Sequence, residues 1–372
     1  MSLLIGLMSG TSMDGIDAAL VDTSTHQLLH GITRPYSRPI QQLLLTACNH
    51  ETMNLADFCK LDRQVGYEFS QAVSHLITQS QIDRSKIVAI GSHGQTIAHD
   101  GRCTMPYTMQ VGCPHTIAEF TGYTVVADFR TRDMVVGGQG APLAPLYHQA
   151  LFAQYSDPLV VINIGGIANI SYLNRGYSGI GYDIGPGNCL IDAWNKKYRQ
   201  TDYDADGAWA ATGVVLPSLL QRLLSDPYFT ASKPKSIGKE YFSLAWLSPH
   251  LYSDYAPQDV QATLLELTVI AISEAVMQCP SLPQQAVICG GGVHNSELLK
   301  KLQQRLPLVS VASTQALGVN PDYLEAMMFA WLAAKALKQE PSDLTTITGA
   351  KTMAVLGAIY PAPQMSISHN KL

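Results

Sequence analysis

The chain of 372 residues lacks the marks of several protein classes. Its seven cysteines form no Cys-x-x-Cys pair and are odd in number, which argues against a disulfide framework and a structural zinc site and fits a reducing compartment. No apolar run approaches the roughly 20 residues that span a bilayer. The first basic residue is Arg34, so the beginning of the chain lacks the positive flank of a signal peptide. We therefore expect a cytoplasmic protein with no membrane partner.

Charged residues are scarce, at 14% of the chain, and the net charge is -5. This balance argues against nucleic acid as a general partner, because proteins that bind it carry clustered positive charge. Hydrophobic residues make up 47% of the chain, which is ample for a buried core. Since 372 residues exceed the size at which one core keeps growing, we expect two domains.

Three catalytic motifs are also missing. The only Gly-Lys pair, Gly238-Lys239, is followed by Glu240, so the chain has no P-loop. Neither the Gly-x-Gly-x-x-Gly fingerprint of dinucleotide-binding folds nor the Gly-x-Ser-x-Gly elbow of acyl-transferring serine enzymes occurs. Histidines such as His93 and His99 do not have metal-ligand spacing, and no metal ligands are assigned.

The chain has instead a set of glycine-rich tips that follow apolar strands. Residues 3–22 predict a strand, a tight turn and a second strand, with small and polar residues at the tip. Glycine lets the backbone approach closely, so this tip suits a phosphate, although a plain hairpin with a polar tip is the alternative. Residues 159–173 repeat the pattern, and a strand at 286–289 runs into the glycines 290–292. Together these tips favour a nucleoside triphosphate bound between two related domains.

Two polar segments follow strands of the first half. A short strand at 86–90 runs into residues 92–96, and open α/β folds usually place their chemistry in such loops. Residues 128–133 are densely charged in a chain that has few charges. The glycines and proline of 136–142 suit a bend between two domains, so we place the boundary near there.

Helices are predicted from apolar spacing and from their caps. Asn54 is available to cap a long amphipathic helix, and residues 260–279 are apolar nearly all round, which indicates a buried helix. Asn320 is expected to cap another long helix that Pro321 begins. Residues 353–360 are expected to form the last strand.

Six short motifs follow one another along the chain. They are Gly-Thr-Ser-Met-Asp-Gly-Ile-Asp at 10–17, Ser-His-Gly-Gln-Thr at 92–96, Asp-Phe-Arg at 128–130, Asn-Ile-Gly-Gly-Ile-Ala-Asn at 163–169, Asp-Ile-Gly-Pro-Gly-Asn at 183–188 and Cys-Gly-Gly-Gly at 289–292. Together they closely resemble the anhydro-N-acetylmuramic acid kinase family. The match runs from the first strand to the last helix. It implies the α/β fold of the actin-like ATPase and sugar kinase superfamily, in which two ribonuclease-H-like domains flank an interdomain cleft. We place these domains at 1–135 and 136–372, with the C-terminal segment free to return to the first.

The resemblance also implies a reaction. In this family ATP phosphorylates the 6-oxygen of 1,6-anhydro-N-acetylmuramic acid while water opens the anhydro bridge, which gives N-acetylmuramic acid 6-phosphate for peptidoglycan recycling. The reaction needs a base that takes a proton from water, and donors or Mg²⁺ that stabilise the phosphoryl charge. The family precedent further implies a homodimer.

Two carboxylates are candidates for the base that the reaction needs. Asp183 stands at a strand end beside glycines and matches the family's catalytic aspartate, although an Asp before Gly often only caps a turn. Glu325 is the rival, because the family match places its helix end near the sugar, yet a negative charge in a first helical turn is favoured regardless of function.

Arg130 is the expected partner of the sugar's lactyl carboxylate, because a guanidinium binds a carboxylate with two prongs. Its alternative is a structural ion pair with Asp128 or Asp133. Gln95 and Thr96 are expected to bond sugar hydroxyls, and His93 is a weaker candidate. The substrate-binding residues implied are His93, Gln95, Thr96, Asp128 and Arg130.

The nucleotide site implied by the family match lies at the three tips. Many sugar kinases of the superfamily carry an Asp before the first Gly-Thr that helps to hold hydrated Mg²⁺, whereas Met8 and Ser9 stand there in this chain. Asp14 and Asp17 are the nearby substitutes, and either is also able to cap the turn. The residues implied to bind ATP are Gly10, Thr11, Ser12, Met13, Asp14, Gly15, Asp17, Gly165, Gly166, Asn169, Gly290, Gly291 and Gly292.

Two other functions stay open at this point. One is an ordinary sugar or acyl kinase that opens no ring, which predicts that no oxygen from water enters the product. The other is a non-metabolic actin-like ATPase, which predicts ATP turnover without sugar and polymerisation with nucleotide.

Overall fold

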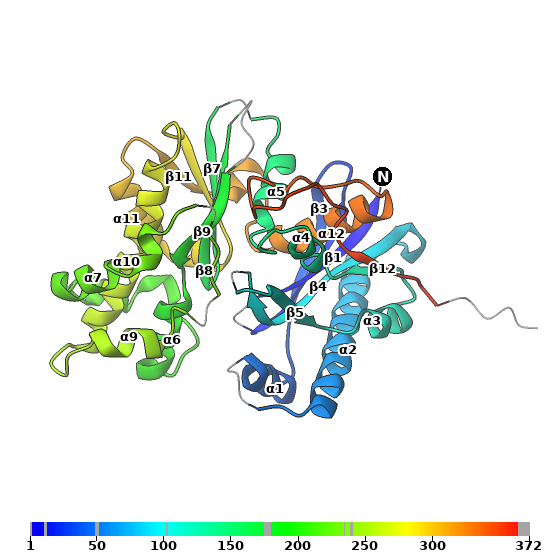
Figure 1. The fold of residues 1–372 in the computed structure, drawn as a ribbon, viewed down its shortest axis with the longest axis horizontal. Helices are drawn as coiled ribbons and strands as arrows, with labels where there is room; N and C mark the ends of the chain where they lie inside the picture. The colour runs from blue at the N-terminus through cyan, green and yellow to red at the C-terminus, as the bar shows by residue number, and fades with distance from the viewer. Residues whose placement is uncertain are drawn as a thin grey trace, which may run out of the picture.

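The computed structural model describes residues 2–10, 13–48, 52–101, 103–155, 157–174, 180–233, 235–238 and 241–363. A mixed sheet organises the first half (Figure 1). Its strands are β1 (Leu3–Ser9), β2 (Gly15–Asp22), β3 (Gln27–Pro35), β4 (Ile87–Asp100), β5 (Tyr107–Val111), β6 (Val125–Ala127) and β12 (Ala358–Tyr360). The order is β12-β6-β4-β1-β2-β3, with β5 paired to β4. Strand β1 is antiparallel to β2, and β2 is antiparallel to β3, whereas β1, β4 and β6 run parallel to one another.

The second sheet repeats this arrangement. Its strands are β7 (Leu159–Ile164), β8 (Ile167–Leu173), β9 (Ile180–Pro186), β10 (Gln285–Cys289) and β11 (Ser310–Ser313). The order is β11-β10-β7-β8-β9, with β7 antiparallel to β8, β8 antiparallel to β9, and β7, β10 and β11 parallel. Five strands of each sheet therefore match in order and direction, as expected for two ribonuclease-H-like units, and the predicted repeat and fold class are confirmed.

Helices cover both faces of the first sheet. They are α1 (Arg38–Cys48), α2 (Leu55–Ser80), α3 (Pro114–Thr121), α4 (Thr131–Val135) and α12 (Leu324–Leu337), with the 3-10 turn η1 (Arg84–Lys86). Alternate residues of β1 point to opposite faces, as the pleat requires. Ile5 belongs to a core with α2, while Leu4 and Met8 belong to a core with α12. As predicted, Asn54 caps α2, because its side chain accepts a hydrogen bond from the Asp57 amide.

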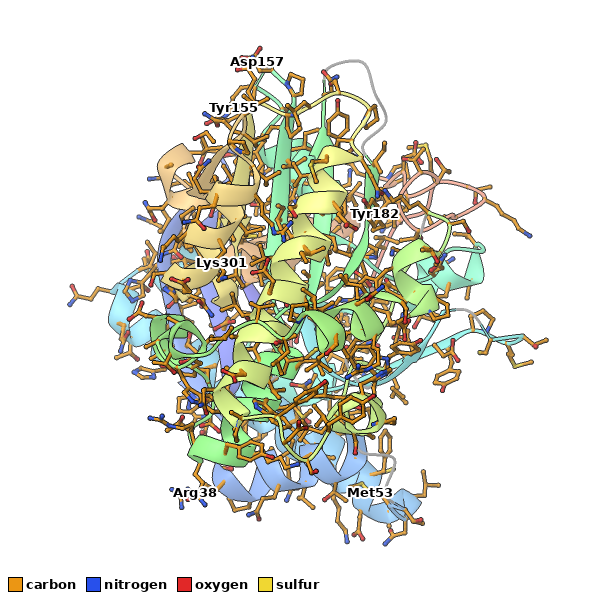
Figure 2. All side chains as sticks on the ribbon, turned by 90° about the vertical axis from the view of Figure 1, so that its left-hand side faces the viewer. Arg38, Met53, Tyr155, Asp157, Tyr182 and Lys301 are labelled. Atoms are coloured by element: carbon orange, nitrogen blue, oxygen red, sulfur yellow. The ribbon has the colours of Figure 1, made fainter. Side chains whose placement is uncertain are left out.

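The second half surrounds its own sheet with shorter helices and one long helix, α10 (Pro257–Met277). Contrary to the expectation that no apolar run approaches a membrane span, this helix is long and apolar enough to cross a membrane, but 89% of its most apolar window is buried inside the structure. It is therefore a core helix, as its apolar character predicted, and Figure 2 shows it in front of the strands of the second sheet. The other α-helices are α5 (Ala144–Leu151), α6 (Cys189–Arg199), α7 (Pro217–Leu224), α8 (Pro227–Thr230), α9 (Leu244–Leu247) and α11 (Ser296–Arg305). The 3-10 turns are η2 (Ala205–Gly207), η3 (Ala210–Thr212), η4 (Ser248–His250), η5 (Gly291–His294) and η6 (Thr314–Leu317).

Three predicted boundaries were wrong. Residues 92–96, which were expected to form a loop after a short strand at 86–90, lie inside β4 (Ile87–Asp100). The other two boundaries lie near the C-terminus. Helix α12 begins at Leu324 rather than at Pro321, because the Asn320 side chain accepts a hydrogen bond from the Asp322 amide and closes a separate turn. The last strand is only Ala358–Tyr360. Both α12 and β12 lie on the first sheet, to which the orange and red segments return in Figure 1. The division near residue 135 stays a prediction.

Two glycines allow α12 to lie directly on the first sheet. Gly6 of β1 and Gly91 of β4 are paired neighbours in the sheet. A Cβ atom on Gly6 would meet the Ala326 carbonyl oxygen at 1.7 Å, and one on Gly91 would meet the Phe329 carbonyl oxygen at 2.0 Å. The helix backbone therefore rests on the strand backbone, with no side chain between them.

Candidate active site

Three charged residues from distant parts of the chain come together. Arg130 follows β6, Asp183 lies in β9, and Glu325 is the second residue of α12. The Arg130 guanidinium interacts electrostatically with the carboxylates of both Glu325 and Asp183. The structure thus brings together the two predicted catalytic carboxylates and the predicted anion-binding arginine.

Glu325 is positioned by the close packing of α12 on the first sheet. Its carboxylate hydrogen-bonds the Asn163 side chain, which belongs to the second sheet. Burial raises the pKa of Glu325 above its ordinary value, while Arg130 and Asn163 act in the opposite direction. The carboxyl group is therefore more readily protonated than a free glutamate.

Asp183 is buried, and backbone groups hold it from several sides. Its amide donates to the Lys235 carbonyl oxygen at 2.9 Å, and its Oδ2 accepts from the Ile237 amide at 3.0 Å. The Tyr228 hydroxyl donates to the Asp183 carbonyl oxygen at 2.8 Å. This segment fixes the carboxylate in one orientation.

Asn163, Asn169 and Asp183 are neighbours across three strands. Asn163 pairs with Asn169 between β7 and β8, and Asn169 pairs with Asp183 between β8 and β9. Within the described part of the chain, the Asn169 Oδ1 atom is buried without a hydrogen-bond partner. A polar row therefore connects the Asp183 position with the Asn163 partner of Glu325.

Arg130 is oriented by a histidine and a carbonyl group. Its Nε donates to His93 Nε2 at 2.9 Å, and its Nη1 donates to the Gly140 carbonyl oxygen at 2.7 Å. Because His93 Nε2 accepts, its proton lies on Nδ1, which is 2.9 Å from the Gly94 carbonyl oxygen. Burial and the nearby Arg130 lower the pKa of His93 well below its ordinary value. His93 therefore contacts Arg130 as a neutral imidazole.

Asp133 supports Arg130 indirectly. Its Oδ2 accepts from the Gly140 amide at 2.7 Å, and its Oδ1 accepts from Thr348 Oγ1 at 2.7 Å. Gly140 is the residue whose carbonyl group binds Arg130. Among the described residues Arg130 has no ion pair with Asp128 or Asp133, so the simple ion-pair alternative is not what the structure contains.

The remaining predicted sugar-binding residues have different surroundings. Gln95 is fully buried, with Oε1 2.6 Å from Ser9 Oγ, so its described contacts lie inside the protein. Thr96 is half-buried and accepts a hydrogen bond from Gln110. Asp128 is exposed and adopts a positive φ of 58° after β6. Their roles at the sugar stay predictions.

The tip of the first hairpin carries acidic groups. Met13 is buried with a positive φ of 56°, and its amide donates to the Gly10 carbonyl oxygen at 3.2 Å. Burial raises the pKa of Asp17 to about 7, and the neighbouring Asp14 and Glu325 carboxylates add to this shift. Asp14 is exposed, and Gly15 begins β2. The predicted residues Thr11 and Ser12 lie outside the described residues.

Some of the glycines at the tips of the second half are closely packed against neighbouring atoms, and others have space around them. The Gly165 and Gly166 carbonyl oxygens accept from the amides of residues 187–189, which ties the hairpin to the start of α6. A Cβ on Gly165 would come no closer than 3.6 Å to a neighbouring atom, whereas one on Gly290 would meet Asn163 Oδ1 at 2.2 Å. Gly292 packs on Ile164 in the same way, while Gly291 has space around it. The open positions are thus Gly165 and Gly291.

Sequence reasoning missed three contributors to this site. Asn163 lies in one of the six motifs but had no predicted role, although an asparagine inside an apolar strand is a signal for a polar contact. Gly6 and Gly91 let the first turns of α12, which carry Glu325, pack directly on β1 and β4. This role is visible only in the folded structure, because both glycines lie far from α12 in the sequence. In the described part of the chain, no three His, Cys, Asp or Glu side chains gather as a metal site.

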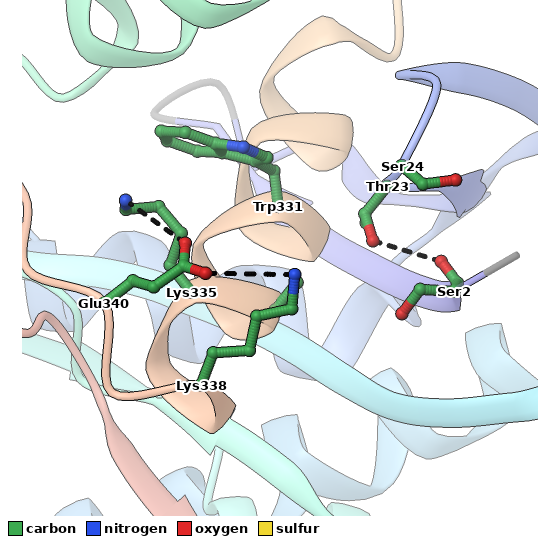
Figure 3. A pocket seen from close by; sticks show the side chains of 8 residues that line it. Ser2, Thr23, Ser24, Trp331, Lys335, Lys338 and Glu340 are labelled. Atoms are coloured by element: carbon green, nitrogen blue, oxygen red, sulfur yellow. Dashed lines mark hydrogen bonds and ion pairs between the residues drawn. The ribbon is translucent and has the colours of Figure 1, made fainter.

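A separate pocket lies at the other end of α12, about 15 Å along the helix from Glu325 by its rise per residue. Its lining includes Trp331, and Glu340 lies 3.7 Å from Lys335 Nζ and 3.9 Å from Lys338 Nζ (Figure 3). This pocket has two lysines around one carboxylate, whereas the Arg130 site has one guanidinium near two carboxylates, so the two sites differ in charge.

Comparison with known proteins identifies the relatives of this chain. A kinase named anhydro-N-acetylmuramic acid kinase from Legionella pneumophila (strain Lens) is 53% identical, covering 97% of this chain and 99% of that protein. The protein of the same name from Xanthomonas campestris pv. campestris (strain 8004) is 46% identical and covers 97% of both chains. A ROK family glucokinase structure from Streptomyces griseus is 15% identical, with a TM-score of 0.43 and coverage of 90% of this chain and 100% of that one. This TM-score is too low to support the fold assignment, which rests on the strand order of the two sheets. The family model for anhydro-N-acetylmuramic acid kinase matches residues 2–362, so the chain belongs to the anhydro-N-acetylmuramic acid kinase family.

Proposed function

We propose that the chain uses ATP to phosphorylate 1,6-anhydro-N-acetylmuramic acid at its 6-oxygen and opens the anhydro ring with water. Membership of the family supports the kinase activity and the acceptor sugar. The observation that carries the proposal is the meeting of Arg130, Asp183 and Glu325. The product is N-acetylmuramic acid 6-phosphate, an intermediate of peptidoglycan recycling.

Asp183 is the proposed base. It accepts a proton from water while the water oxygen bonds to the anomeric carbon and the bond from that carbon to O6 breaks. O6 then bonds to the γ-phosphorus of ATP, and the bond from that phosphorus to the bridging oxygen breaks, which releases ADP. The fixed orientation of the Asp183 carboxylate supports this role, because a base must be aligned with its water.

Arg130 is the proposed partner of the lactyl carboxylate. His93 and Gly140 hold two edges of its guanidinium, which leaves its geometry well defined for a carboxylate. Thr96 and Asp128 are proposed to contact the sugar directly. Gln95 and His93 are proposed to act at this site through their contacts with Ser9 and Arg130.

The phosphates of ATP are proposed to lie at the glycine-rich tips. Gly165 and Gly291 have space for a ligand, and Asn169 has a buried oxygen without a partner among the described residues. The acidic surroundings of Asp17 fit a cation, and Asp14 or Asp17 would hold Mg²⁺ together with the phosphates. When bound, Mg²⁺ neutralises negative charge on the phosphoryl group.

We also propose a cytoplasmic homodimer whose domains divide near residue 135. The family precedent supports the dimer, and the two sheets support the division. Sedimentation of the purified chain measures its mass directly, and a monomer at all concentrations would contradict the dimer.

Oxygen labelling tests the proposed reaction. In water enriched with ¹⁸O, mass spectrometry is expected to find one label at the anomeric carbon of the phosphorylated product. A phosphorylated sugar without label would indicate an ordinary sugar kinase. ATP turnover that does not depend on sugar would indicate a non-metabolic ATPase.

A further inference from the structure

A chain of polar side chains links the neighbouring strands β4 and β5. The strands pair Thr96 with Gln110 and His99 with Thr108. Gln110 Nε2 lies 3.1 Å from Thr96 Oγ1 and 2.7 Å from Thr108 Oγ1. Thr108 Oγ1 in turn lies 3.1 Å from His99 Nδ1. A hydrogen-bonded series of side chains therefore runs from Thr96 through Gln110 and Thr108 to His99.

One assignment of the hydrogens gives each donor between these four side chains an acceptor. The Gln110 amide nitrogen has two hydrogens and donates one to each threonine hydroxyl. Each hydroxyl keeps its own hydrogen, and in this assignment Thr108 donates that hydrogen to His99 Nδ1. With Nδ1 accepting, a neutral His99 carries its hydrogen on Nε2. Burial and the nearby Arg130 keep His99 neutral, because they lower its pKa to about 4.

His99 Nε2 lies close to the Arg130 site. Within the described residues this atom is buried without a hydrogen-bond partner. A Cβ on Gly140 would come within 3.2 Å of His99 Cε1, and the Gly140 carbonyl oxygen binds Arg130 Nη1. The His99 donor and the Arg130 guanidinium are therefore neighbours.

We propose that Gln110 is a positioning residue that fixes Thr96 and, through Thr108, His99 as hydrogen-bond donors to the acceptor sugar. The His99 Nε2–H group donates to the carboxylate of the sugar beside Arg130. This inference rests on the proposed function, because it places the acidic sugar at Arg130. A buried donor without a partner favours a ligand that supplies an acceptor, and it discriminates against one that does not.

Gln110→Glu tests the direction of the hydrogen bonds that link Gln110, Thr108 and His99. A glutamate carboxylate accepts hydrogen bonds from both threonine hydroxyls. The Thr108 oxygen must then accept from His99 Nδ1–H, so a neutral His99 has no hydrogen on Nε2. The Nε2 lone pair would face the substrate carboxylate, which is another acceptor. We expect the KM for the acidic sugar to rise about tenfold or more, with kcat and the KM for ATP changed less than about threefold. Met109→Gln, at an exposed neighbour on the same strand, is the control and leaves all three constants unchanged.

A second pair of variants keeps the test decisive if Gln110→Glu fails to fold. His99→Phe removes the donor and is expected to raise the sugar KM about tenfold, whereas His99→Gln keeps a donor and recovers part of the affinity. The lactyl amide of the sugar, which lacks the negative charge, is expected to lose less affinity than the acid in each variant.

The outcomes separate this inference from the proposed function. If the wild-type chain forms no labelled sugar phosphate, the proposed function fails. If the wild type forms it but Gln110→Glu or His99→Phe binds the acidic sugar as well as the wild type, the positioning role is wrong. Equal losses in the KM for sugar and for ATP would indicate a merely structural role and would also overturn it.

Discussion

The two halves share one strand order but cover their sheets differently. In the first half, Gly6 and Gly91 let the backbone of α12 rest on β1 and β4. In the second half, the corresponding strands β7 and β10 contain no glycine and meet α10 through apolar side chains such as Ile162 and Ile288. The same strand order thus allows a helix to pack by backbone contact in the first half and by side-chain contact in the second. The close contact in the first half fixes the helix end that carries Glu325.

The halves also contribute different groups to the site, although each supplies a carboxylate, Glu325 from α12 on the first sheet and Asp183 from β9 of the second. The first half supplies Arg130 and the neutral imidazoles of His93 and His99, whereas β9 of the second half supplies Asp183. This division predicts that substitutions in the two halves will affect different steps.

The largest expected effect comes from Asp183→Asn. Asparagine keeps an oxygen that can accept from the Ile237 amide but removes the base, so kcat is expected to fall by at least about 10³-fold while ATP binding stays intact. Steady-state kinetics and binding of a non-hydrolysable ATP analogue measure the two quantities. Glu325→Gln is expected to cost less. Retention of more than a tenth of the activity in Asp183→Asn would remove it from its proposed role.

The next effect concerns the contact between α12 and the first sheet. Gly6→Ala places a Cβ 1.7 Å from the Ala326 carbonyl oxygen, so we expect the free energy of unfolding to fall by about 3 kcal/mol. Urea unfolding measures this change. Gly165→Ala is the matched control in the second half, since its Cβ would be 3.6 Å from the nearest atom, and its effect is expected to stay within about 0.5 kcal/mol. Equal effects would mean that the halves do not differ in packing.

The smallest expected effect is a pH dependence. His148 is fully buried, its Nδ1 lies 2.7 Å from Ser171 Oγ, and burial lowers its pKa from 6.5 to about 3. Between these values the unfolded chain binds a proton that the folded chain does not, so stability falls as the pH falls from 6.5 toward 3. The contribution is up to about 1.4 kcal/mol per pH unit.

His148→Gln removes this contribution. Its stability at neutral pH is expected to be lower, but its loss between about pH 6.5 and 5 should be shallower than that of the wild type by up to about 1.4 kcal/mol per pH unit. His75→Gln, at an exposed position, is the control. Unchanged slopes in urea unfolding across this range would contradict the assignment.

The sequence predicted local features better than distant contacts. The Asn54 cap, the buried helix and the repeated hairpins follow from neighbouring residues, and all three occur. The start of α12 was misplaced because Asn320 caps a turn rather than the helix.

Contacts between distant residues explain what the sequence did not reveal. Gln110 meets Thr96 only because β4 and β5 pair in one register with an irregularity between residues 96 and 98. Gly6 is needed because the backbone of a helix more than 300 residues later in the chain packs against it. Neither contact is predictable from the spacing of apolar and polar residues along the sequence.

The return of α12 to the first sheet has a consequence for synthesis. Strands β7 to β11 are contiguous in the chain, so the second sheet has all its strands once residue 313 has been made. Leu4, Met8 and Val126 of the first sheet share their core with α12 and stay without this cover until residue 337 has left the ribosome. The half that is made first therefore completes its folding last, and its apolar face is exposed to chaperones or to aggregation for most of translation.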